Sequence, residues 1–254
     1  MADDLDHTPA ARPPPGRESN FDNPESRAYQ LVIVIAICLA LVVLFTSTRI
    51  CTRFRINRSF GADDWITIIA TIFAIAYSGL ILHLLHEPGG GILGIHLWDV
   101  SIPKLMAYTK GSLADSILIR ITNTLVKVGL LALYLRLFNI ISHVRTMVWV
   151  GMFAVISYCI AFVITDLVAC VPRSDEAGGW VDPKLLARCN AIVPDFITAG
   201  AWFNVFTDFY ILMIPLHMIP KLGLSRNRQI GVALIFLTGL LQVQILTPGD
   251  DHLT

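Results

Sequence analysis

The chain has 254 residues, of which 55% are hydrophobic and only 15% are charged, and its formal net charge is zero. A soluble domain usually carries about 25% charged residues, so this composition excludes an ordinary soluble protein. The balanced charge also creates no global field that would attract nucleic acid, and no nucleic-acid partner is predicted.

The first 27 residues differ in composition from the rest of the chain. Four prolines lie between Pro9 and Pro15, and the segment has too little apolar surface to offset the entropy that it would lose on folding. We therefore predict a disordered, extracellular tail over residues 1–27. It lacks the basic start and directly following apolar stretch of a cleaved signal peptide.

Six long apolar runs follow the tail. They occupy residues 28–48, 65–85, 112–135, 147–169, 196–218 and 230–246. A helix needs about 20 mostly apolar residues to cross a bilayer, and the first five runs reach that length. The pattern predicts an all-α, polytopic helix bundle in a lipid bilayer, with a transmembrane domain over 28–246 and a short polar tail over 247–254.

The basic residues of the connections predict the orientation. If the N-terminus is outside, the inner connections carry nine Lys and Arg in 38 residues, and the outer segments carry eight in 79. Cytoplasmic loops are enriched in these residues, so we predict an extracellular N-terminus in the plasma membrane. The arginines of the first inner connection would then face a cytoplasmic signalling partner; these are Arg49, Arg53, Arg55 and Arg58.

The five cysteines separate by position. Cys38 and Cys159 lie inside apolar runs and are predicted to be small core residues, while Cys51 lies in the first basic connection as a free thiol or a palmitoylation site. Cys170 and Cys189 flank the second large outer connection, on the oxidising side where disulfides persist. We predict a disulfide between them; two unpaired thiols are the alternative.

The third run is unusual because it contains charged side chains. Arg120, Asn123 and Lys127 follow one another at spacings of three and four, so they share one helix face. Charges at membrane depth usually face a bundle interior or a wet cavity, which predicts a polar pocket or an ion path. Alternatively, Asp115 and Arg120 lie near the outer surface and only Lys127 is deep.

Further polar residues lie in the fourth and fifth runs. Asp166 lies in the fourth, and Asp208 lies in the fifth with Asn204 four residues before it on the same face. Asp208 and Lys127 have opposite charges at comparable depth, which predicts an ion pair that is either structural or part of a site. The candidate pocket residues are Arg120, Asn123, Lys127, Asp166, Asn204 and Asp208.

Motifs of enzymes and metal sites are missing from the sequence. His83, His86, His96 and Asp99 gather around the first outer connection, but without the His-x-x-x-His spacing of a helical metal site. No Gly-x-Ser-x-Gly elbow and no Walker sequence is present. We therefore predict no catalytic residue, no metal and no cofactor.

Several short stretches together resemble a known family. Arg49 and Arg53 end the first run, Gly61 to Trp65 open the second, Gly94 to His96 lie in the first outer connection, and Lys127 and Leu133 to Phe138 lie in and at the end of the third. They are followed by Cys170 to Pro172, Trp180, Cys189, Asp208, Pro215, Phe236 and Gly239. In this order and spacing the chain resembles the fungal rhodopsin-domain family of integral membrane proteins. That family includes Pth-type receptor-like proteins of plant-pathogenic fungi and a membrane protein of the satratoxin gene cluster.

The resemblance implies a seven-helix, receptor-like fold. It does not imply retinal, because a retinal Schiff base needs a buried lysine, usually in a seventh helix, and Lys127 is the only lysine deep in a run. The apolar pattern stops after about Gln244. We therefore expect a chain truncated before the seventh helix, with a face that meets lipid or another protomer instead.

These observations predict a receptor-like membrane protein that senses an unknown ligand without enzymatic activity. One alternative is a transporter of small molecules or ions that uses the charged residues of the third and fifth runs. A weaker alternative is an intramembrane hydrolase that holds a metal with His and Asp ligands.

Overall fold

The computed structural model describes residues 8–222, apart from 12, 15, 22–23, 58–59, 87–90, 139–140, 175–179 and 181. Its long elements are the helices α2 (Ala28–Cys51), α3 (Ala62–Leu85), α4 (Ile102–Phe138), α5 (Ser142–Cys170) and α6 (Pro183–Leu222). A π-helical segment, η1 (Thr52–Asn57), continues α2, and a 3-10 turn, η2 (Leu97–Asp99), precedes α4. The described residues contain no sheet, only an isolated bridge between Pro9 and Ser101.

Within the described residues, five helices are long and apolar enough to cross a membrane, which confirms the predicted class of helical membrane protein. They correspond to the first five apolar runs. The sixth run, 230–246, and the polar tail, 247–254, lie outside the described residues. The predicted total of six helices and the seven-helix fold therefore stay predictions.

Two helices are longer than predicted. α4 begins at Ile102 rather than at residue 112, and α6 begins at Pro183 rather than at residue 196. An apolar run marks where hydrocarbon surrounds a helix, whereas backbone hydrogen bonding continues beyond the membrane surface. The 37 residues of α4 extend about 55 Å at 1.5 Å per residue, well beyond the ~30 Å of a hydrocarbon core.

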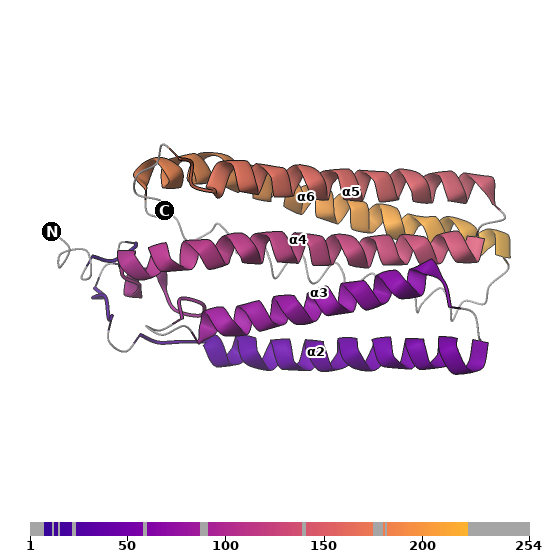
Figure 1. Ribbon diagram of the computed structural model, residues 1–254, viewed down its shortest axis with the longest axis horizontal. Coiled ribbons are helices and arrows are strands. Elements are labelled where there is room, and N and C mark those ends of the chain that lie inside the picture. The colour runs from indigo at the N-terminus through magenta and orange to yellow at the C-terminus, as the bar shows by residue number, and fades with distance from the viewer. Residues whose placement is uncertain are drawn as a thin grey trace.

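Successive helices run in alternating directions, and α4 lies between the α2–α3 pair and the α5–α6 pair (Figure 1). α4 contacts α3, α5 and α6, so it is the element that joins the two halves. We call the end where α5 stops and α6 starts the disulfide end. The opposite end, where α2 stops and α3 starts, is the arginine end.

The side chains are sorted as expected for a protein in lipid. Apolar residues such as Phe153 and Trp202 point outward and are 76% and 73% exposed, which suits a bilayer better than water. An apolar core lies between α4, α5 and α6 toward the arginine end and consists of Leu131, Val144, Val148, Ile211 and Ile214.

Helix α2 is the least buried of the five. It packs on α3 alone among the long helices of the described region and has no buried residue. The prediction that Cys38 is a core residue is therefore wrong, because Cys38 lies exposed on this helix. Cys51 is also an exposed free thiol, whereas Cys159 is partly buried.

The disulfide end is tied covalently. Cys170, the last residue of α5, is bonded to Cys189 near the start of α6, which confirms the predicted bridge. Beside it, the guanidinium of Arg188 donates hydrogen bonds of 2.9 Å to the carbonyls of Ala169 and of Val171. These bonds satisfy acceptors that the end of a helix otherwise leaves without partners.

Parts of the N-terminal tail lie against the connection between α3 and α4. The backbone N–H of Ala10 donates to the carbonyl of Val100 at 2.9 Å, and that of Arg27 donates to Gly94 at 2.8 Å. These bonds place the described parts of the tail at the disulfide end. The disorder expected of residues 1–27 as a whole stays a prediction.

Candidate functional site

A polar stripe runs along the face of α4 that meets α5 and α6. It consists of Ser116, Arg120, Asn123 and Lys127, whose spacings of four, three and four keep them on one side of a helix. The stripe lies on the disulfide-end side of the apolar core. Lys127 is buried, Ser116 and Arg120 are partly buried and Asn123 is exposed, so most of the predicted polar face points into the bundle.

Lys127 is the most firmly held member of the stripe. Its ammonium Nζ lies 2.9 Å from Oδ1 of Asp208, so the predicted ion pair is present. Nζ also donates to the Thr207 hydroxyl at 2.6 Å and to the Asn204 carbonyl at 3.0 Å. Three acceptors match the three hydrogens of an ammonium, which explains how a lysine that is only 5% exposed can keep its charge.

The two partners of this ion pair are unequally buried. The side chain of Lys127 is 6% exposed, whereas that of Asp208 is 44% exposed. Two side-chain amides extend the hydrogen bonding from this pair. Asn204 Nδ2 donates to Asp208 at 3.4 Å, and Asn123 Nδ2, one turn before Lys127 on α4, donates to Asn204 Oδ1 at 2.7 Å. The pair is thus buried on the α4 side and open on the α6 side.

A small cavity of about 20 Å³ lies beside these residues, between α4, α5 and α6. Four of the six predicted pocket residues line it, namely Arg120, Asn123, Lys127 and Asn204. Val155, Tyr158 and Phe203 supply much of the remaining wall, and the rings of Tyr158 and Phe203 stack with their centroids 4.3 Å apart. The cavity therefore has cationic and amide groups on one side and aromatic groups on the other.

Asp166 lies one step further toward the disulfide end. Its carboxylate is 2% exposed and accepts a hydrogen bond of 2.7 Å from the Ser116 hydroxyl. Asp115, the neighbour of Ser116, belongs elsewhere: it interacts electrostatically with Tyr77 of α3 and with Tyr108. Asp166 thus interacts with Arg120 of the pocket without lining the cavity, whereas Asp115 is separate from it.

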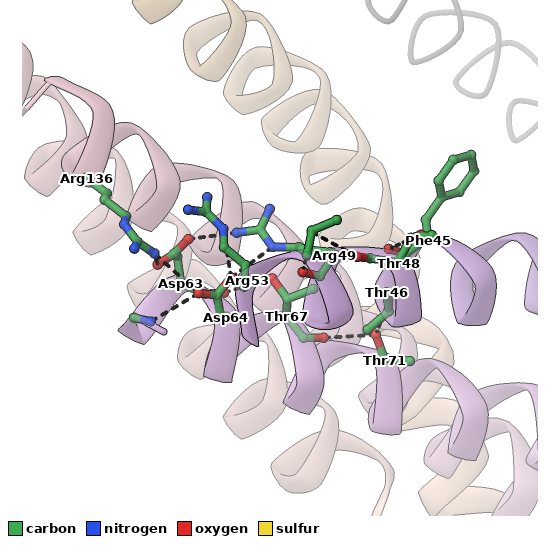
Figure 2. Close-up of polar contacts among 12 residues, drawn as sticks. Phe45, Thr46, Thr48, Arg49, Arg53, Asp63, Asp64, Thr67, Thr71 and Arg136 are labelled. Atoms are coloured by element: carbon green, nitrogen blue, oxygen red, sulfur yellow. Dashed lines mark hydrogen bonds and ion pairs between the residues drawn. The ribbon is translucent and has the colours of Figure 1, made fainter. Parts of the chain in front are cut away.

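A second polar group, at the arginine end, is denser than the pocket. Asp63 and Asp64, in the first turn of α3, are 3% and 1% exposed. Arg49 of α2 contacts them at 2.7 and 3.1 Å, and Arg136 of α4 contacts them at 2.9 and 3.2 Å (Figure 2). Arg53 lies 3.8 Å from Asp64. We call these five residues the arginine network; it joins the ends of α2 and α4 to the start of α3.

Asp64 also stabilises its own helix. Its Oδ2 accepts a hydrogen bond of 3.0 Å from the backbone N–H of Gly61, the residue before α3. A carboxylate at this position also complements the positive end of the helix dipole. About two turns further along α3, the hydroxyl of Thr71 lies 3.0 Å from that of Thr46 and adds a contact between α2 and α3 (Figure 2).

A larger and mainly apolar cavity of about 360 Å³ lies between α2, α3 and α4. Its walls include Leu41, Phe45, Ala70 and Leu130, with Arg49 at the arginine end. It offers few polar groups to orient a ligand. The pocket between α4, α5 and α6 is therefore the stronger candidate for specific recognition.

The described residues hold no group of three or more His, Cys, Asp or Glu side chains placed to bind a metal ion. Of the histidines gathered near the first outer connection, His96 stacks on Trp98 with ring centroids 4.2 Å apart, and His86 Nδ1 lies 2.9 Å from the carbonyl of Leu82. Both contacts are local to the α3–α4 connection.

Sequence reasoning missed three features of these sites. Ser116 and Tyr158 are common residue types inside apolar runs. Their place in the site depends on which residues of other helices lie next to them, and the sequence does not indicate those neighbours. The arginine network did have a signal, because two arginines end one helix and two aspartates open the next. The missing information was that Arg136, more than 70 residues later, returns to the same end.

Comparisons with known proteins agree with this architecture. A family model described as the fungal rhodopsin domain matches residues 48–246, more than half of the chain. The "Polyenoic acids biosynthesis gene cluster protein Ba17b" of Metarhizium anisopliae is 24% identical over 91% of this chain and 62% of its own length.

Two further relatives are similarly distant. A "SAT4 family membrane protein" of Emericella nidulans is 29% identical over 58% of this chain and 38% of its own length. The "Fugralins biosynthesis cluster protein 2" of Gibberella zeae is 24% identical over 94% of this chain and 58% of its own length. The chain thus spans less than two thirds of the length of these curated relatives. No solved structure matches it.

Proposed function

The chain belongs to the fungal rhodopsin domain family, and from that premise we propose that it is a receptor-like membrane protein. It would bind a small molecule in the pocket between α4, α5 and α6 without converting it chemically. The observation that carries this proposal is the incomplete pairing of the pocket. Among the described residues, two buried polar atoms beside the cavity, Arg120 Nε and the Tyr158 hydroxyl, lack hydrogen-bond partners, and in native proteins such atoms are nearly always paired.

Helix α4 would carry the signal. It holds Arg120, Asn123 and Lys127 at the pocket and Arg136 in the arginine network. Lys127 and Arg136 are nine residues apart, or about 13 Å along the helix. A ligand that shifts α4 would therefore also change how Arg136 contacts Asp63 and Asp64. This is the two-site arrangement that allosteric coupling requires.

Hydrogen exchange of the purified protein in nanodiscs tests the coupling. A panel of small acidic, basic and neutral amphipathic compounds is screened for protection of the peptides that line the pocket. We expect any compound that protects them also to change exchange at residues 61–66, in the arginine network. Gly200→Leu, which fills the space next to Tyr158, should abolish both effects. Protection at the pocket without any change at 61–66 would contradict the receptor mechanism.

The second candidate is a transporter, favoured by the half-exposed carboxylate of Asp208. In the described conformation, however, the apolar core of Leu131, Val148 and Ile214 lies between the pocket and the arginine end. A continuous polar path would require that core to open. Solute uptake into reconstituted vesicles that disappears with Asp208→Asn would replace the receptor proposal with this one.

The proposed orientation has the arginine end in the cytoplasm and the N-terminus outside, in the plasma membrane. Arg49 and Arg53 form ion pairs with Asp63 and Asp64. Among the described arginines of this segment, Arg55 is the exposed one, and it is the residue that we propose faces a cytoplasmic partner. Asn57 begins an Asn-Arg-Ser glycosylation sequence. We predict that Asn57 carries no glycan when the protein is expressed in fungal cells. A shift in mobility on glycosidase treatment that Asn57→Gln removes would reverse the orientation.

A further inference from the structure

Two buried donors beside the pocket have no partner. Arg120 Nε and the Tyr158 hydroxyl are enclosed, and neither makes a hydrogen bond in the described structure. The Arg120 guanidinium lies over the Phe162 ring, 4.1 Å from its centroid, rather than against a carboxylate. Asp166 is close enough to interact with it electrostatically but is hydrogen-bonded to Ser116 instead.

The space next to these donors fits a single small group. The cavity of about 20 Å³ exceeds the 10–15 Å³ that one water molecule needs, and it is far too small for a whole ligand. Gly200 of α6 leaves room for the Tyr158 hydroxyl beside this space. A Cβ at this residue would overlap the Tyr158 hydroxyl and would lie 3.4 Å from Nη1 of Arg120.

We infer that Arg120 and Tyr158 form a recognition site for the carboxylate of an apolar acid. One carboxylate oxygen enters the cavity and accepts hydrogen bonds from Arg120 Nε–H and from the Tyr158 hydroxyl. This inference rests on the proposed function and names the class of ligand for the same pocket. Val155 and Phe203 of the cavity wall supply apolar contacts to the carbon next to the carboxylate, and the rest of the acid lies outside the cavity.

The charge on Arg120 favours a carboxylate over a neutral carbonyl group. A guanidinium at membrane depth is costly unless an anion accompanies it, and Asp166 interacts with Arg120 electrostatically while its hydrogen bond goes to Ser116. A ligand carboxylate supplies that charge, and charge-assisted hydrogen bonds are about twice as strong as neutral ones. An amide of the same size would make the same contacts without the charge.

Photo-crosslinking in nanodiscs tests this inference. The probe is a decanoic acid that carries a diazirine and an alkyne, used at mildly alkaline pH, where the free acid is ionised. The comparison compound is the primary amide of the same chain. We expect the acid to label peptides of α4, α5 and α6 around the pocket, with half-saturation at a concentration about tenfold lower than that of the amide.

Variants separate the two donors. Arg120→Gln should raise the half-saturating concentration of the acid about tenfold and that of the amide only about threefold, because the amide loses a neutral hydrogen bond and the acid a charge-assisted one. Tyr158→Phe, which removes only the hydroxyl, should raise that of the acid about threefold. Arg145→Gln is the matched control, because Arg145 is an exposed arginine on α5 outside the pocket. It should leave both values unchanged.

Gly200→Ala provides a test that leaves every charge in place. Because the added Cβ would overlap the Tyr158 hydroxyl and displace it, this variant should weaken labelling by the acid at least as much as Tyr158→Phe does. An intact Cys170–Cys189 bridge and a monodisperse elution profile show that each variant is folded. Unchanged labelling by the acid in Gly200→Ala would overturn the inference.

The two proposals fail in different ways. If acid and amide label the pocket peptides equally, and Arg120→Gln affects neither, the carboxylate site is wrong while the pocket stays a binding site. If neither probe labels peptides of α4, α5 and α6 above the level seen in Gly200→Leu, this inference fails and the proposed function loses its support.

Discussion

The arginine network and the pocket both include charged side chains of α4, yet they differ in how completely these side chains are paired. In the network, two carboxylates that are 3% and 1% exposed meet three arginines from α2, η1 and α4. In the pocket, Lys127 has three acceptors, but Arg120 Nε and the Tyr158 hydroxyl have no hydrogen-bond partner in the part of the chain that the structure describes.

This difference separates structural from recognition roles. A buried charge whose partners are all supplied by the protein holds helices in register, and removing one partner strands the others. A buried donor without a protein partner lowers the stability of the fold. In a binding site the same donor is available to form a hydrogen bond with a ligand. The network is therefore expected to determine stability and the pocket to determine binding.

The largest expected effect is at Asp64. Asp64→Ala leaves Arg49, Arg53 and Arg136 crowded around Asp63 alone and removes the hydrogen bond to Gly61. We expect the free energy of unfolding to fall by about 3 kcal/mol, at the lower end for a broken buried pair, because the arginines are 22–30% exposed. The unfolding midpoint in detergent measures this change.

Asp64→Asn and Asp195→Ala are its controls. The Asn variant keeps an acceptor for Gly61 and removes only the charge, so it should retain part of the stability. Asp195 is an exposed carboxylate of α6, and its removal should change the midpoint little. A loss from Asp64→Ala no greater than that from Asp195→Ala would show that the network is not structural.

An intermediate effect is expected at the Lys127–Asp208 pair, which belongs to the paired part of the pocket. Asp208→Ala leaves an ammonium that is 6% exposed without its counter-ion, whereas Lys127→Met leaves a carboxylate that is 44% exposed. We therefore expect Asp208→Ala to be the more destabilising single change, by roughly 1 kcal/mol. The double variant should recover part of the loss.

A double-mutant cycle measures this coupling. Contacting charges usually show interaction energies of about 0.5–3 kcal/mol. Strict additivity of the two losses would mean that the 2.9 Å contact contributes nothing. Equal losses of unfolding free energy from the two single changes would mean that Asp208 is as well shielded from solvent as Lys127. The proposed asymmetry in burial would then be wrong.

Much of this arrangement follows from the sequence. Long apolar runs force backbone hydrogen bonds to be made within each segment, so five helices and their approximate positions could be predicted. The spacing of Arg120, Asn123 and Lys127 placed them on one helix face. Opposite charges at similar depth predicted the ion pair between Lys127 and Asp208. The predicted placement of the α5–α6 loop on the oxidising side led to the pairing of Cys170 with Cys189.

The rest depended on which helices become neighbours. Nothing local in the sequence says that Arg136 reaches Asp63, or that Tyr158 of α5 meets Arg120 of α4 and Gly200 of α6. Helix ends were also missed, because α4 and α6 extend past the hydrocarbon into polar sequence. Pairwise spacing within one helix is visible in a sequence, whereas packing between helices is not.

The smallest expected effect on stability is at Ser116, and it tests the boundary between the two roles. Ser116→Ala removes the hydroxyl that donates to Asp166 at 2.7 Å. A lost hydrogen bond to a buried charge costs about 1.5–3 kcal/mol. Here we expect only about 1 kcal/mol, because Arg120 has an unpartnered Nε and already interacts with Asp166 electrostatically. It can turn toward the carboxylate and replace the lost donor.

That rearrangement would take the guanidinium away from the cavity. Ser116→Ala should therefore weaken labelling by the decanoic acid probe about tenfold while changing the unfolding midpoint little, the opposite of the pattern expected for Asp64→Ala. Ser112→Ala is the matched control, because the Ser112 hydroxyl donates only to the Thr109 carbonyl of its own helix. If Ser116→Ala instead unfolds the protein as readily as Asp64→Ala and leaves labelling intact, then Asp166 is a structural charge and Arg120 is not free to serve a ligand.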